Sequence, residues 1–307
     1  MLAIVAPGQG SQTPGFLLPW LEVGETSRLL EKWSQLINLD LHHLGTTADA
    51  DEIKETSNAQ PLLVAAGLIG FAALFPSGQS SVTAVAGHSV GEITVAAMAG
   101  VIDNESAMKL VRTRGAAMSQ AATGSNSGMA AVLGGDRDVV LAHLATLNLV
   151  AANENGASQI VAAGSLEAIA KLLENAPAGS RVRPLAVSGA FHTAVMAPAV
   201  PVLSALAAEI HPTDPRIKVL SNKDGHVVSS GTEIVARIVG QIAGPVRWDL
   251  CMTTLSDMGI TGVLEVPPAG TLVGLLKRAT PSIETFALKN PEDLAAAQEF
   301  IAKHGAN

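Results

Sequence analysis

Ser89 is the residue whose surroundings most clearly predict chemistry. It lies in Gly87-His88-Ser89-Val90-Gly91, which fits the G-x-S-x-G pattern of a nucleophile elbow. An apolar run over 81–86 precedes the motif and a helical pattern over 90–99 follows it, so the motif occupies a strand-to-helix turn. There a serine is exposed at a helix N-terminus, where partial positive charge favours a developing oxyanion. The alternative is that Ser89 and Glu92 only form a capping box.

His192 is the candidate base. A serine hydroxyl is a poor nucleophile without one, and the sequence contains eight histidines. His192 lies in 188–193, a turn of small residues between a predicted strand and a predicted helix, so it is either the base or an ordinary loop histidine. His88 adjoins Ser89, and neighbouring side chains at an elbow point apart. The other six lie in polar settings and are expected at the surface: His42, His43, His143, His211, His226 and His304.

Two further features are ambiguous on their own. Arg114 interrupts an Ala- and Met-rich helical pattern close to the elbow, but most helical arginines solvate a face or pair with a neighbour such as Glu105. The loop 7–12, Pro-Gly-Gln-Gly-Ser-Gln, follows the first apolar segment and can present backbone N–H groups to an oxyanion or a phosphate. It is neither a Walker A loop nor a full dinucleotide fingerprint.

The segments that must position these residues alternate between apolar strands and helices. The hydrophobic content of 48% is supplied by short aliphatic runs, which suit buried parallel strands and their covering helices. Residues 57–61 are expected to open a long apolar helix with a capping residue and an early proline. The apolar run 61–76 is too short for a membrane span and contains two glycines, so we expect a buried helix.

The pattern changes between 128 and 187. There the order is strand, helix, two strands, helix and strand, over 129–133, 136–147, 149–152, 159–163, 165–173 and 181–187. This is the βαββαβ order of a ferredoxin-like unit. Strand and helix then alternate again over 193–210, 217–220, 233–242, 262–266, 271–279 and 285–288.

The sequence therefore predicts an α/β fold, with a hydrolase-like core built on a parallel sheet and a small inserted ferredoxin-like domain. Residues 1–124 and 189–307 would form the large domain and residues 125–188 the small one. A cleft between the two is the expected binding site.

Composition excludes several classes of function. A net charge of −8, no tyrosine and few other aromatic residues argue against nucleic-acid binding. Cys251 is the only cysteine, which excludes an intramolecular disulfide and favours a reducing compartment, and the sequence shows no metal-site spacing. The start, 1–5, has no basic region ahead of its apolar residues, so we expect no signal peptide. The expectation is a cytoplasmic protein without nucleic-acid or membrane partners.

Taken together and in order, five motifs resemble the malonyl-CoA:acyl-carrier-protein transacylase family. They are 8–12 (GQGSQ), 87–92 (GHSVGE), 114–115 (RG), 189–193 (GAFHT) and Gln241 with 245–248 (PVRW). The resemblance covers nearly the whole chain and implies a free-standing enzyme. It implies ping-pong transfer of a malonyl group from malonyl-CoA to the phosphopantetheine thiol of acyl carrier protein, with no permanently bound cofactor. The product would supply fatty-acid or polyketide synthesis, two pathways that the resemblance does not separate.

The resemblance also implies a role for each catalytic position. Ser89 would be the acylated nucleophile and His192 its general base. The family orients this histidine by a backbone carbonyl, and Gln241 occupies the matching position. Backbone N–H groups of Gln9 and Val90 would form the oxyanion hole.

Substrate contacts are implied in the same way. Arg114 would bind the free malonyl carboxylate in a two-pronged salt bridge, while His88, Asn153 and Asn155 would line the cleft. Glu154 does not match the family pattern. Because carrier proteins of this kind are acidic, docking requires a local basic surface. The candidates for it are Arg181, Arg183, Lys223, Lys277 and Arg278.

Three alternatives can be weighed on the sequence. An α/β-hydrolase places an acid between serine and histidine and puts the histidine near the C-terminus, whereas more than a hundred residues follow His192. A non-catalytic carrier-binding module would lack Ser89, His192 or Arg114. A methylmalonyl or longer substrate would be crowded by Phe191.

Overall fold

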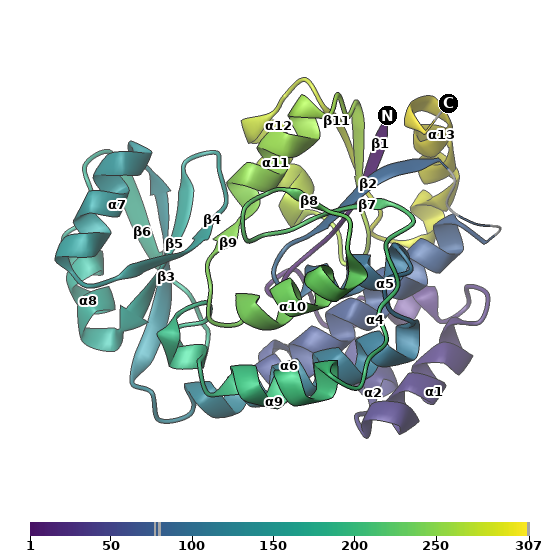
Figure 1. Ribbon diagram of the computed structural model, residues 1–307, viewed down its shortest axis with the longest axis horizontal. Helices are drawn as coiled ribbons and strands as arrows, with labels where there is room; N and C mark the ends of the chain where they lie inside the picture. Colours follow the sequence, from purple (N-terminus) through teal and green to yellow (C-terminus); the bar gives the residue numbers. More distant parts are fainter. Residues whose placement is uncertain (77, 79–80, 306–307) are drawn as a thin grey trace.

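A computed structural model describes residues 1–76, 78 and 81–305 of the protein. The described chain is built on two sheets (Figure 1). The larger sheet has the strand order β11-β10-β1-β2-β7-β8. Its strands are β1 (Leu2–Ala6), β2 (Val82–Gly87), β7 (Lys218–Leu220), β8 (Val227–Val228), β10 (Gly262–Glu265) and β11 (Glu284–Ala287). All neighbouring pairs are parallel except β7 with β8. The predicted parallel core sheet is confirmed.

Helices cover both faces of this sheet (Figure 1). Side chains of β1 alternate between the faces: Leu2 and Ile4 join the larger hydrophobic core, and Ala3 and Val5 join a second one. Helices on the first face include α4 (Thr56–Leu74), α5 (Gly91–Met98), α6 (Asn104–Ala122), α9 (Ala199–Ala207), α10 (Gly231–Gln241) and α13 (Leu294–His304). The second face is covered by α11 (Trp248–Asp257) and α12 (Thr271–Ala279). Three short helices lie between β1 and α4: α1 (Thr26–Ile37), α2 (Leu41–Thr46) and α3 (Ala50–Lys54).

The start of α4 differs from expectation. The helix begins at Thr56 with no side-chain cap, so the predicted capping residue within 57–61 is wrong. Pro61 lies inside the helix and has no N–H to donate to the carbonyl of Ser57. Arg112 Nη1 of α6 donates to that carbonyl instead, at 3.1 Å. Contact with α6 therefore stabilises a helix start that local capping rules do not predict.

α4 is also the one described helix that is long and apolar enough to cross a membrane by length and composition. Of its most apolar 18-residue window, 72% is buried inside the protein, as in a core helix. This agrees with the buried helix that the sequence predicts.

The smaller sheet has the order β6-β3-β5-β4-β9. Its strands are β3 (Ser127–Gly134), β4 (Val150–Glu154), β5 (Gln159–Ser165), β6 (Ser180–Pro184) and β9 (Val246–Arg247), and α7 (Arg137–Thr146) and α8 (Leu166–Glu174) pack on it. The pairs β6–β3, β3–β5 and β5–β4 are antiparallel, which is the ferredoxin-like arrangement. The two-residue strand β9 was not predicted, and it pairs in parallel with β4. The exact division at 124/125 and 188/189 stays a prediction.

Other elements depart from the predicted ones. The single helix expected over 193–210 is wrong: a 3-10 turn, Ala194–Met196, precedes α9, because Pro198 has no N–H to donate into a continuous helix. The last predicted strand of the small sheet ends at Pro184, and 185–187 leave the sheet to line a cavity. Helices α11 and α13 were not predicted.

His304 lies in a buried position, so its predicted surface location is wrong. It is 6% exposed, and its Nδ1 lies 3.0 Å from Thr261 Oγ1. The ring packs over Gly262, where an added Cβ would lie 2.4 Å from its Cγ. A glycine on β10 therefore makes room for a histidine of the terminal helix α13.

Candidate active site

Ser89 occupies the sharp turn between β2 and α5. Its φ is 52°, in the left-handed region that residues other than glycine rarely adopt. A Cβ on Gly91 would lie 2.3 Å from the carbonyl oxygen of Ala6, and one on Gly87 would lie 2.0 Å from the carbonyl carbon of Gly91. Both glycines are needed for the close passage of these backbones, as in a nucleophile elbow. The capping-box alternative is wrong, because Val90 is the N-cap and makes no side-chain cap bond.

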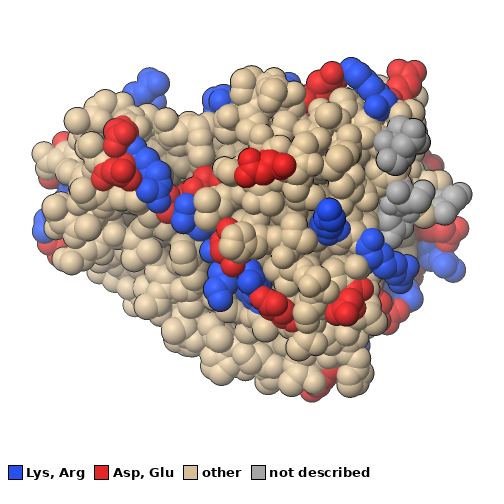
Figure 2. All heavy atoms as spheres, turned by 45° about the horizontal axis from the view of Figure 1, so that its top comes forward, with Lys and Arg blue, Asp and Glu red and all other residues tan. Residues whose placement is uncertain are grey.

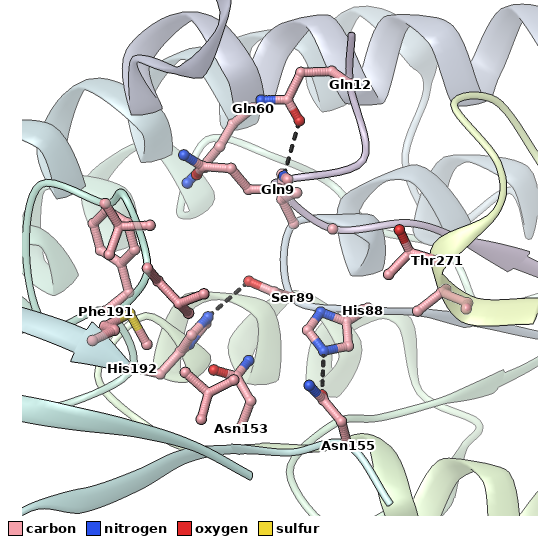
Figure 3. Close-up of a pocket in the computed structure, with 18 of the residues that line it drawn as sticks. Gln9, Gln12, Gln60, His88, Ser89, Asn153, Asn155, Phe191, His192 and Thr271 are labelled. Atoms are coloured by element: carbon pink, nitrogen blue, oxygen red, sulfur yellow. Dashed lines mark hydrogen bonds between the residues drawn. The ribbon is translucent and has the colours of Figure 1, made fainter. Parts of the chain in front are cut away.

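A hydrogen-bonded chain links Ser89, His192 and Gln241, and Figure 3 shows its first link, between Ser89 and His192. Ser89 Oγ lies 2.8 Å from His192 Nε2, and His192 Nδ1 lies 2.9 Å from the main-chain oxygen of Gln241. Because a carbonyl oxygen only accepts, Nδ1 carries the ring hydrogen and Nε2 can accept the serine proton. Burial, with the nearby Arg114 cation second, lowers the pKa of His192 to about 3. The ring is therefore a neutral acceptor at pH 7.

Arg114 lies behind the nucleophile and is 1% exposed. Its Nη1 donates to Gln60 Oε1 at 2.7 Å, and its Nη2 donates to Ser89 Oγ at 3.1 Å and to Gln241 Oε1 at 3.2 Å. The pairing with Glu105 that the sequence left open is not formed, since Glu105 pairs with a lysine at 2.6 Å. Burial lowers the pKa of Arg114 to about 10, which leaves it charged at pH 7. The site thus holds a buried cation that contacts the nucleophile oxygen.

A cavity of about 470 Å³ opens in front of Ser89 and His192, between the two sheets (Figure 3). On one side it meets the segments that follow the carboxyl ends of β1 and β2, the usual place for a ligand on a parallel sheet. On the other side it meets β4 and β5 of the small sheet. Of the predicted site residues, Gln9, His88, Ser89, Val90, Asn153, Asn155 and His192 line this cavity. The predicted cleft is therefore present.

The main-chain N–H groups of Gln9 and Val90 lie at the cavity and have no hydrogen-bond partner among the described residues. The side chain of Gln9 is turned to the wall, where Nε2 donates to Lys54 O at 3.2 Å and to Thr56 Oγ1 at 3.4 Å. Both N–H groups are thus available to a bound oxygen atom. Their part in an oxyanion hole stays a prediction.

His88 and Asn155 form a pair on the cavity wall (Figure 3). His88 Nε2 lies 2.8 Å from Asn155 Oδ1, and Asn155 Nδ2 donates to Gln159 Oε1 at 3.0 Å. The His88 ring also packs on Trp248, with centroids 5.8 Å apart. Burial lowers the pKa of His88, so this ring is neutral at pH 7.

Glu154, the position that departs from the family pattern, does not line the cavity. It stands between Asn153 and Asn155, which do, and successive strand side chains point to opposite faces. Its carboxylate lies 2.7 Å from Arg137 Nε and 3.4 Å from Arg247 Nε. The charge is therefore held in ion pairs outside the cavity.

Sequence reasoning missed three polar residues of the site: Gln60, Glu92 and Asn222. Gln60 is 2% exposed and accepts from Arg114, although a lone glutamine at the start of an apolar helix was the only signal for it. Asn222 is wholly buried, and its Oδ1 accepts the Ser89 N–H at 2.7 Å. Its position just after β7 was the available signal. Among the described residues, no group of three or more His, Cys, Asp and Glu could hold a metal ion.

A serine on a strand–helix elbow, with a neutral histidine held by a main-chain carbonyl in an α/β fold, defines a serine enzyme that acts on acyl groups. Residues 4–298 match the family described as acyl transferase domain. The Mycobacterium tuberculosis malonyl CoA-acyl carrier protein transacylase is 49% identical over 298 residues, covering 96% of this chain and 98% of its own. The Escherichia coli protein of the same name is 33% identical, covering 97% and 99%. The chain belongs to the malonyl CoA-acyl carrier protein transacylase family.

Solved structures agree with this assignment. The crystal structure of MCAT from Mycobacterium tuberculosis superposes with a TM-score of 0.93 at 48% identity, covering 97% of this chain and 99% of that one. A type II PKS acyl-carrier protein in complex with its malonyl-transacylase gives a TM-score of 0.92 at 30% identity, with coverage of 97% and 99%. The α/β fold with its small ferredoxin-like unit is thus shared over nearly the whole chain.

Proposed function

We propose that this protein transfers a malonyl group from malonyl-CoA to the phosphopantetheine thiol of an acyl carrier protein, through a malonyl ester on Ser89. The observation that carries the proposal is the buried Arg114 guanidinium, which contacts the nucleophile oxygen at 3.1 Å. Such a cation suits an acyl group that ends in a carboxylate, because guanidinium and carboxylate pair through two parallel hydrogen bonds. The names of the relatives support the same reaction.

The first half of the reaction acylates Ser89. His192 Nε2 takes the hydroxyl proton as Oγ attacks the thioester carbonyl carbon, and a C–O bond forms. The N–H groups of Gln9 and Val90 bind the oxyanion of the tetrahedral intermediate. The C–S bond then breaks, and the proton on His192 passes to the departing CoA sulfur. The carbonyl of Gln241 keeps the ring in the required tautomer throughout.

The second half runs in reverse with a different thiol. The phosphopantetheine sulfur of the carrier protein gives its proton to His192 and attacks the ester carbon of malonyl-Ser89. The C–O bond to Oγ breaks, and His192 returns the proton to the serine. One base serves both halves because each thiol approaches through the same cavity.

Arg114 provides selectivity in this scheme. The malonyl carboxylate satisfies a cation whose hydrogen-bond acceptors among the described residues, Gln60, Gln241 and Ser89, are all neutral. An acetyl group leaves the guanidinium without that partner. A site built around a polar partner can reject a substrate that lacks it by on the order of 10⁴-fold.

The partner and the setting are part of the same proposal. The five basic residues named from the sequence are exposed and make no ion pair within the described chain: Arg181, Arg183, Lys223, Lys277 and Arg278. Figure 2 shows acidic and basic side chains interspersed over one face, so docking would use local basic groups. We place the enzyme in the cytoplasm, in fatty-acid or polyketide synthesis, without a permanently bound cofactor.

Intact-mass spectrometry tests the proposal. The protein is exposed briefly to malonyl-CoA, acetyl-CoA or methylmalonyl-CoA, with Ser89→Ala as the control, and phosphopantetheinylated carrier protein is added last. We expect a malonyl adduct that requires Ser89, forms far less with the other donors and moves to the carrier. Absence of the adduct, or its decay to malonate equally fast without carrier, would instead assign a hydrolase or a binding module.

A further inference from the structure

Glu92, on the first turn of α5, is a buried carboxylate that the reaction scheme does not use. It is 4% exposed, and it forms no ion pair with any described residue. Its Oε1 accepts the main-chain N–H of Asn222 at 2.6 Å, and its Oε2 accepts a short hydrogen bond from Gln241 Nε2. A buried carboxylate is costly unless its oxygens are satisfied, so a function for this one is to be expected.

Both partners of Glu92 hold catalytic groups. Asn222 Oδ1 accepts the Ser89 N–H at 2.7 Å, which helps to keep the elbow in its positive-φ conformation. The main-chain oxygen of Gln241 accepts from His192 Nδ1 at 2.9 Å. One carboxylate therefore lies a single residue away from the nucleophile and from the base.

The side chain of Gln241 supplies a third link. An amide can be turned end for end with almost no change of shape, so its partners decide its direction. Ionised Glu92 only accepts, so Gln241 must turn Nε2 toward it. The Oε1 atom then faces Arg114 Nη2 at 3.2 Å, and Nε2 also donates to Asn222 Oδ1 at 3.0 Å. The carboxylate and the donor-only guanidinium thereby impose the same direction on the amide.

We propose that Glu92 is a positioning residue for acyl transfer, which acts through Gln241 and Asn222 to hold Arg114, His192 and Ser89 toward one acyl group. The inference rests on the proposed function and adds a determinant of malonyl selectivity outside the cavity. Replacing Glu92 by glutamine puts one NH₂ group where the carboxylate had an acceptor oxygen. That NH₂ group must then face one of the two donors, the Asn222 N–H or Gln241 Nε2. Gln241 can satisfy that group only by reversing its amide, which turns an NH₂ group toward Arg114 and an oxygen toward Asn222 Oδ1.

The test compares Glu92→Gln with the wild-type enzyme at pH 8. Burial raises the pKa of Glu92 to about 7, against the opposing effects of the Asn222 N–H, Arg114 and Arg237. Because pH 8 lies above this pKa, most of the Glu92 carboxyl is ionised there. The measurements are the rates of Ser89 loading by malonyl-CoA and acetyl-CoA, together with Tm. The free-energy cost of one misdirected buried hydrogen bond corresponds to a fall in rate of about 10- to 100-fold. We expect that loss for malonyl-CoA and a roughly tenfold fall in the malonyl-to-acetyl ratio.

The matched control is Glu265→Gln, which neutralises another buried carboxylate. Glu265 is 0% exposed and accepts the N–H groups of Gly270, Leu272 and Val273 at 2.9 to 3.0 Å, with no contact to Ser89 or Arg114. We expect it to lower Tm while the malonyl-to-acetyl ratio keeps its wild-type value. Stability and selectivity are thereby separated.

A second variant covers the case in which Glu92→Gln does not fold. Gln241→Met keeps the main-chain carbonyl that binds His192 and removes the amide, so the same fall in ratio is expected. In the double variant the two effects on the ratio should not add, because both act through one amide. A wild-type ratio in either single variant, or equal losses for both donors, overturns the inference. Failure of the wild-type enzyme to load malonyl on Ser89 would instead overturn the proposed function.

Discussion

Replacement of Arg114 by alanine tests the basis of malonyl selectivity. The guanidinium is 1% exposed, so the energies measured for screened surface ion pairs do not apply to it. Breaking a buried ion pair costs about 3 to 5 kcal/mol. At about 1.4 kcal/mol per factor of ten, kcat/KM for malonyl-CoA should fall by roughly 10²- to 10⁴-fold.

The expected change is a loss of preference as well as of rate. Acetyl-CoA has no carboxylate to lose, so the ratio of kcat/KM for malonyl-CoA over acetyl-CoA should approach one in Arg114→Ala. Arg114→Lys should be intermediate, because an ammonium group keeps the charge but cannot bind a carboxylate through a planar fork and also reach Gln60 and Gln241.

Stopped-flow or quenched loading of Ser89, with the adduct read by intact mass, measures kcat/KM for malonyl-CoA and for acetyl-CoA. The matched control is Arg112→Ala, two residues earlier on α6, which removes an arginine whose one side-chain hydrogen bond to a described residue is with the Ser57 carbonyl. It should lower Tm with loading rates within a few-fold of wild type. A full malonyl preference in Arg114→Ala, or an equal loss in both alanine variants, would refute the assignment of the carboxylate to Arg114.

Two further predictions concern the base and the elbow. Because burial and the Arg114 cation lower the pKa of His192 to about 3, its ring signals in NMR should not titrate between pH 8 and 5. In Arg114→Ala the midpoint should move upward, and a wild-type midpoint near 6.5 would contradict this account. Gly91→Ala places a Cβ 2.3 Å from the carbonyl oxygen of Ala6, so it should lower Tm by several degrees and abolish loading. A variant with wild-type Tm and loading would show that the elbow tolerates a side chain there.

Local patterns in the chain were enough to predict most of the elements. The apolar run 81–86, which is followed by Gly87, gave the position of β2, and the βαββαβ order between 128 and 187 was correct in every element. The motif 87–91 placed Ser89 on its turn because the two glycines and the flanking periodicities are properties of adjacent residues. The exceptions, such as the start of α4 and the two-residue β9, depend on partners from distant segments.

The site itself was only partly predictable in this way. Residue spacing left His192 and Arg114 ambiguous, and the resemblance to a family, rather than a physical argument, raised them above the alternatives. The structure brings His192 from 103 residues away to within 2.8 Å of Ser89 Oγ, and it buries Arg114 beside Gln241, 127 residues further along.

The sequence by itself determined the nucleophile's turn, the alternation of strands and helices and the absence of a disulfide framework, since each follows from neighbouring residues or from composition. Tertiary structure decided which polar side chains share one buried network. Local sequence gives no hydrogen-bond partner for Gln60, Glu92 or Asn222, because a hydrogen bond across the core depends on how helices α4, α5 and α10 pack on the sheet. Short-range periodicity sets the elements, while the burial and direction of each polar group depend on long-range packing.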